Sequence, residues 1–154
     1  MAISDLEQIL RSMAPTRRAG EYVFVTTASL PPEVLVEASV RETEGPSFVI
    51  ARDDADRLAV SYDFVAAWIT LTVHSALDAV GLTAAVSTAL AAKGIPCNVI
   101  AGSRHDHLLV PVDAVDAVFL ALQRLTGGDD NRTAPSNAAT DTERGPGGGR
   151  PQGR

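Results

Sequence analysis

Cysteine is almost absent from this sequence: Cys97 is the only one among 154 residues. A lone cysteine excludes an internal disulfide framework, and it fits a reduced, cytoplasmic setting. Long apolar runs are absent too, because no segment approaches the roughly 18 unbroken apolar residues that a membrane span needs. The N-terminal MAISDLEQIL lacks a basic flank and a long apolar core, so we expect no signal peptide.

An excess of basic side chains is also missing. The chain carries 13 Lys and Arg residues against 19 Asp and Glu residues, which gives a formal net charge of -6. Without a basic stripe it cannot displace counterions from a nucleic-acid backbone, so we expect no nucleic-acid partner. The apolar fraction of 45% is ordinary for a globular protein, and the length suggests one domain or two small ones.

Large apolar side chains are absent after Thr126. Residues 127–154 are rich in Gly, Pro, Asn, Asp and Arg, and their only apolar side chains are scattered alanines. Such a composition cannot bury enough surface to offset the entropy lost on ordering. We therefore predict a disordered tail over residues 127–154, with a binding tail as the alternative, and a folded part over residues 1–126.

The pattern of residues 1–63 predicts a divergent N-terminal half of the folded part. Ser4 and Glu7 have the spacing of a helix capping box, and Pro15 is expected to close that first helix. Runs of β-branched and aromatic residues then predict strands, and early aspartates favour a short helix. The expected strands cover residues 21–28, 34–42 and 47–51, and the expected helix covers residues 52–59.

Residues 64–126 show a clearer pattern. Alternating apolar residues predict strands, and apolar residues at helical spacing predict helices. The expected elements are a strand over 66–73, a helix over 82–93 capped by Gly94, a strand over 95–101, a turn over 102–104, a strand over 105–112 and a helix over 114–125 capped by Asp113.

The order of elements in residues 64–126 is β-α-β-β-α, which is the first five-sixths of a ferredoxin-like βαββαβ unit. The helical crossover implies that the first two strands are parallel. The sixth strand is missing, so a strand from the N-terminal half or a partner chain must fill that edge. We expect the two halves, residues 1–63 and 64–126, to share sheets in one α+β body with helices on one face.

Candidate catalytic residues are few. His105 and His107 lie two apart on a strand and would share a face, but nothing points to the third ligand that a metal needs. Cys97 lies in a strand that reads as buried, where a small core side chain is favoured over a nucleophile. His74 and Ser75 are adjacent and would point in opposite directions, and no G-x-S-x-G elbow surrounds them. We predict no catalytic and no metal site.

The stretch LTVHSALDAVGLTAAV leads from a strand through Gly81 into a helix. One glycine is too few for a phosphate loop, but a single glycine lets a ligand or a neighbouring backbone come close. The helix N-terminus beyond it presents unpaired N–H groups that suit a carboxylate. The N–H groups of Gly81 and Leu82 are candidates for that role, and Asp78 or the Asn98 strand would accept from an ammonium group. Turn geometry alone is the alternative explanation of Gly81.

The segment from Ile69 to Leu122 resembles an ACT domain. The chain is similar to small bacterial proteins in which such a domain follows a shorter, divergent ACT-like half. GEYVFVTT (Gly20–Thr27), RETEG (Arg41–Gly45) and YDFVAAWITLTVHSALDAVGLTAAV (Tyr62–Val86) carry this likeness, which extends over Ser4–Leu125. Eukaryotic cytosolic arginine sensors are similar in build.

The resemblance implies a regulatory, non-catalytic module without a cofactor, which binds an amino acid where two ACT domains pack together, as in a homodimer. A ligand-free protein–protein interaction module is the main alternative, and a metal-dependent enzyme using His105 and His107 is a third. Carried over by position, the implied ligand-binding residues are His74, Ser75, Val80, Gly81 and Leu82, with Asn98 and Val99 opposite them.

Overall fold

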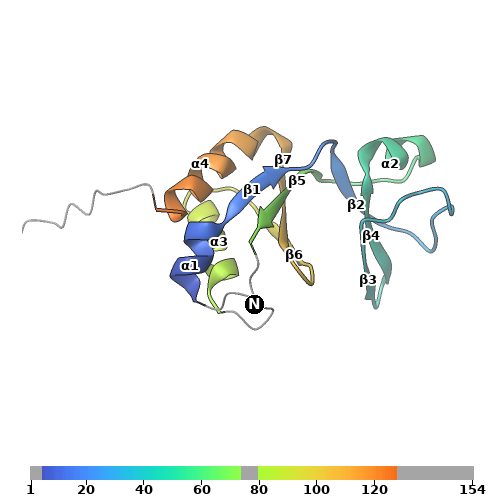
Figure 1. The fold of residues 1–154 in the computed structure, drawn as a ribbon. Coiled ribbons are helices and arrows are strands. Elements are labelled where there is room, and N and C mark those ends of the chain that lie inside the picture. Colours follow the sequence, from blue (N-terminus) through green and yellow to red (C-terminus); the bar gives the residue numbers. More distant parts are fainter. Residues whose placement is uncertain (1–4, 74–79, 128–154) are drawn as a thin grey trace, which may run out of the picture.

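The computed structural model describes residues 5–73 and 80–127, and it shows a mixed α+β fold, as the sequence predicts (Figure 1). None of the helices in these residues is long and apolar enough to cross a membrane. The elements in chain order are α1 (Leu6–Ser12), β1 (Ala14–Arg17), β2 (Tyr22–Thr26), β3 (Ala38–Glu42), β4 (Gly45–Ala51), α2 (Arg52–Leu58), β5 (Val65–Thr72), α3 (Leu82–Ala91), β6 (Asn98–Ala101), β7 (Asp106–Pro111), the 3-10 turn η1 (Val112–Ala114) and α4 (Val115–Leu125).

The described strands form a single seven-stranded sheet in the order β3-β4-β2-β5-β7-β6, and β1 pairs with β5. Every pairing in it is antiparallel. β5 and β6 therefore run parallel to one another, as predicted, but β7 lies between them. We call β2 to α2 the N-terminal unit and β5 to α4 the C-terminal unit.

The edge of β5 that lacks a strand of its own unit is filled from the N-terminal side of the chain. β1 covers one end of it, from Arg17 opposite Ile69 to Ala14 opposite Thr72. β2 covers the other end, where Tyr22 faces Ala66. This confirms the first of the two predicted alternatives. α1 and β1 thus join the C-terminal unit in space, while the boundary between residues 63 and 64 stays a prediction.

All four helices lie over one face of the sheet. Side chains alternate along β5, so Val65, Ala67 and Ile69 share a face. Val65 packs with the core under α2, whereas Ala67 and Ile69 belong to the core under α1, α3 and α4. The opposite face carries Ala66 and Trp68, which pack with residues of β2, β4 and β7 and with no helix.

Two local predictions at the chain's N-terminal side are wrong, and one strand is not among the predicted elements. α1 ends at Ser12, before Pro15, as predicted, but the chain continues as β1, in which Pro15 pairs opposite Leu71. A proline is tolerated there because only one side of β1 is paired in the sheet. The N-cap of α1 is Asp5, whose carboxylate accepts from the Gln8 N–H at 3.0 Å, and Ser4 lies outside the described residues. The strand expected from residue 34 begins only at Ala38, since the Val34 N–H closes a turn onto Pro31.

Smaller differences occur in the C-terminal unit. α3 ends at Ala91, two residues before the predicted end, and Gly94 lies beyond it with φ of +67°. β6 begins at Asn98 rather than at residue 95. Asp113 falls inside η1, and no side chain caps α4. Helix and strand types agree with the prediction, and the differences are confined to the ends.

Replacing Ile9 in α1 should test whether α1 belongs to the C-terminal core. The Ile9 side chain is 0% exposed, so Ile9→Ala should lower the free energy of unfolding by about 2–4 kcal/mol in urea titrations. Leu120→Ala is the control, because Leu120 is 52% exposed and should cost less than about 0.5 kcal/mol. Equal losses in the two variants would contradict the packing of α1 against this core.

Candidate functional site

Gly81 begins α3 in a backbone conformation that few other residues adopt. Its φ is +108°, and it is the N-cap of the helix. A Cβ built on Gly81 would lie 2.8 Å from Cδ2 of Leu6 in α1. The positive φ favours glycine at this turn, whereas the Leu6 methyl lies at the end of a flexible side chain that can move to relieve the contact. The turn-geometry explanation of Gly81 therefore has direct support, and it does not exclude a binding role.

The N-terminus of α3 has no side-chain cap among the described residues. Leu82 is 3% exposed and its side chain packs in the core, so only its backbone is available to a ligand. Val80, in contrast, is 83% exposed. The first N–H groups of the ten-residue helix carry a partial positive charge that favours an anion. The candidate residues His74, Ser75 and Asp78 lie outside the described residues.

Asn98 and Val99 follow one another on β6, so their side chains point to opposite faces of the sheet. Val99 packs against the core beneath α3 and α4, which also contains Leu82. Asn98 pairs opposite Leu109, a residue of the helix-free face. The structure thus places Val99 on the side of the α3 turn and the Asn98 side chain on the other side.

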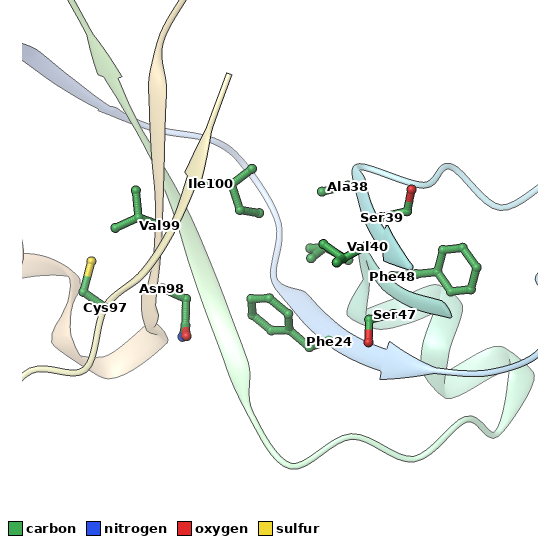
Figure 2. A pocket seen from close by; sticks show the side chains of 11 residues that line it. Phe24, Ala38, Ser39, Val40, Ser47, Phe48, Cys97, Asn98, Val99 and Ile100 are labelled. Carbon is green, nitrogen blue, oxygen red and sulfur yellow. The ribbon is translucent and has the colours of Figure 1, made fainter. Parts of the chain in front are cut away.

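Asn98 instead borders a hollow on the helix-free face, which we call the sheet groove (Figure 2). Its volume is about 430 Å³. One wall comes from the N-terminal unit and the other from β6, so the sequence pattern of a single unit could not reveal it. Its lining residues are Phe24, Ala38, Ser39, Val40, Ser47, Phe48, Val49, Cys97, Asn98, Val99 and Ile100.

Cys97 is half-buried at the edge of this groove, next to the helix-side core. Burial raises the pKa of the Cys97 thiol, which disfavours the nucleophilic thiolate. This supports the interpretation of Cys97 as a small apolar side chain.

Arg18, in the link between β1 and β2, joins the two units. Its backbone N–H donates to the Trp68 carbonyl at 2.9 Å, and its guanidinium lies 5.3 Å from the ring centroids of Tyr22 and Trp68. The same guanidinium donates two hydrogen bonds of 2.7 Å to the Glu37 carboxylate, and these raise the pKa of Arg18. The planar guanidinium can lie near both rings and donate two parallel hydrogen bonds to Glu37 at once, which the ammonium group of a lysine could not. Sequence reasoning gave no signal for this cluster.

His105 and His107 make separate hydrogen bonds. His107 shares a hydrogen bond of 3.1 Å with the Thr70 hydroxyl, and its ring lies 5.3 Å from that of Trp68. His105 lies before β7 and is bonded to the Val73 carbonyl at 3.2 Å. Within residues 5–73 and 80–127, no group of three or more His, Cys, Asp or Glu side chains is placed to hold a metal ion.

The environment of His107 predicts a pH dependence of stability. Burial lowers the pKa of His107 below its ordinary value of 6.5; His105 and Arg18 add to this effect, and Asp106 partly offsets it. The unfolded chain then binds the proton more readily, so His107 should make stability fall as the pH drops through 6.5. We expect His107→Gln to lose less stability than the parent between about pH 8 and about pH 5. Thermal unfolding at each pH would measure this, and parallel losses in both proteins would contradict it.

Known protein families match the N-terminal and C-terminal parts of the chain separately. Two models of the ACT domain match, one over residues 1–67 and the other over residues 64–124. Among curated proteins, none matches the chain.

Similar solved structures include three from different organisms. A Vibrio cholerae protein of unknown function, described as a possible transport protein, is 40% identical with a TM-score of 0.71, over 79% of this chain and 95% of that one. An Agrobacterium tumefaciens protein is 20% identical with a TM-score of 0.55, over 74% and 89% of the two chains. The regulatory subunit of aspartate kinase from Thermus thermophilus is 9% identical with a TM-score of 0.55, over 75% and 98%.

At these identities the second and third likenesses show the fold alone. They agree with a ferredoxin-like ACT fold in each unit, and the first likeness is a match in sequence as well. The two family models together span the described sheet from end to end. The chain therefore belongs to the ACT domain family and carries two ACT-type domains in tandem.

Proposed function

We propose that this protein is a regulatory, non-catalytic module that binds a free amino acid at the turn into α3. The observation that carries the proposal is the start of α3 at Gly81, in an ACT-type domain, without a side-chain cap among the described residues. ACT domains are regulatory modules, and the aspartate kinase subunit of similar fold is itself named a regulatory subunit. The likeness in fold supports a regulatory role and leaves the ligand as our proposal.

The chemistry of an amino acid fits this turn. Its carboxylate would accept from the backbone N–H groups of Gly81 and Leu82, where the helix dipole stabilises negative charge. Its ammonium group would donate to Asp78 or to a carbonyl of the β6 strand, near Val99 on the helix side. His74 and Ser75 would form the rim. Because Asn98 points to the other face, its part in this site would come from its backbone.

We further propose that the protein acts as a cytoplasmic homodimer and signals to a partner enzyme. Described strands leave β6 unpaired on its outer side, so its backbone N–H and C=O groups can pair with a second chain. A dimer formed there would bring two α3 turns and two β6 strands together. Binding at such a junction would change the relative stability of dimer arrangements, which is how a ligand becomes a signal.

A thermal-shift screen of the twenty amino acids tests the ligand. One of them should raise the melting temperature at millimolar concentration, because a ligand at about 100 times its Kd adds about 2.7 kcal/mol to stability. No shift with any amino acid would contradict the proposal.

Substitutions at the α3 turn test the site. Val80→Glu should weaken binding several-fold through repulsion of the carboxylate, whereas Val80→Lys should not, and both are tolerable because Val80 is exposed. Gly81→Val should abolish binding, and Gly94→Val is its control, since Gly94 also has positive φ but has nothing within 4 Å of a new Cβ. Unchanged affinity in Val80→Glu and in folded Gly81→Val would exclude this turn as the site.

A ligand-free interaction module is the second candidate, and the unpaired outer edges of β3 and β6 favour it. β3 and β6 each lack a described neighbour on one side. Light scattering and pull-down with and without the twenty amino acids would separate the candidates. Association that is the same under every condition would favour the interaction module, and association that one amino acid alters would favour the sensor.

A further inference from the structure

The sheet groove lies on the face of the sheet that none of the described helices covers, away from the α3 turn. Its N-terminal wall holds Phe24 and Val40, and its C-terminal wall holds Asn98 and Ile100 on β6. Figure 2 shows Phe24, Asn98 and Ile100 directed into the space between the two walls. A volume of about 430 Å³ falls within the range of small-molecule sites.

The lining carries no charged side chain. Its polar side chains are Ser39, Ser47 and Asn98. The Ser47 hydroxyl already donates to the Glu42 carboxylate at the rim. For the Asn98 amide, in contrast, the described part of the chain offers no hydrogen-bond partner, although its O and NH₂ can accept one bond and donate two. The groove therefore combines apolar walls with one available amide.

The apolar part of the groove is open rather than filled by the protein. Val40 is 62% exposed, and Phe24 and Ile100 are only partly buried. A packed cluster lies at one side of the groove. It contains Val49 and Trp68, which are each 4% exposed. A packed cluster beside exposed apolar walls favours an occupant that covers the walls and removes them from water.

From these features we infer that the sheet groove is a second binding site, for an uncharged small molecule with an aromatic or branched aliphatic body and one hydrogen-bonding group. The body would lie between Phe24, Val40 and Ile100, and the polar group would pair with the Asn98 amide. A free amino acid does not fit, since two charges would be buried without a charged partner. The site is thus distinct from the α3 turn, and it touches both units, so its occupant would hold β6 against the N-terminal strands.

The uncharged fluorescent probe N-phenyl-1-naphthylamine tests this site in the full-length protein. It should bind saturably at one molecule per chain with a rise in fluorescence. Val40→Asp should weaken binding at least about ten-fold by placing a charge in the apolar wall. Leu120→Asp is the matched control: it places the same charge on an equally exposed apolar side chain of α4 and should leave the affinity unchanged. Circular dichroism would show that both variants fold.

A second pair of variants addresses the amide. Asn98→Leu removes the amide that would accept from the probe N–H and should weaken probe binding, and Asn98→Asp, which adds a charge at the same size, should weaken it too. Absence of saturable binding, or equal binding by the Val40→Asp and Leu120→Asp variants, would overturn the inference. So would a change of oligomeric state in Val40→Asp, which would show that a second copy fills the groove. None of these results depends on whether an amino acid binds at Gly81.

Discussion

Strand β5 is the constraint on which the rest of the structure depends. It pairs with β7 along one edge and with β1 and then β2 along the other. Through these pairings β5 forms backbone hydrogen bonds with strands of both units, and neither unit has a complete sheet without it. Among the described residues, the C-terminal unit supplies three strands of its own, and β1 and β2 cover its open edge. Tandem ACT-type domains here form one continuous sheet rather than two separate bodies.

The alternation of side chains along β5 then sorts the molecule into two faces. Ile69 and Leu71 point toward the helices and are almost fully buried. Trp68 points the other way, where its ring meets that of Tyr22 edge-to-face and lies 5.3 Å from the Arg18 guanidinium. A continuous sheet with all helices on one side leaves the other face to be covered by the sheet's own curvature and by a few long side chains. That coverage is incomplete, and the sheet groove is the part that stays open.

The two candidate sites follow from this division and differ in chemistry. On the helix side, the start of α3 offers backbone N–H groups and a helix dipole, which favour an anionic group. On the helix-free side, the groove offers apolar walls and a neutral amide, which favour an uncharged molecule. Both sites use β6, and successive residues of that strand, Asn98 and Val99, contribute to opposite faces.

The sequence by itself determined the local elements of the C-terminal unit, the start of α3 at Gly81 and the absence of an elbow or a phosphate loop around it. These depend on side-chain period, on glycine and on helix-end chemistry, all of which act over a few neighbouring residues. It did not predict β1, because Pro15 ends a helix by every local rule and its place opposite Leu71 depends on a strand more than fifty residues away. Only the tertiary structure decided which segment fills the edge of β5, that Asn98 and the α3 turn lie on different faces, and that β6 meets the N-terminal unit across a groove. Those outcomes depend on pairing and packing between distant segments, which no local pattern encodes.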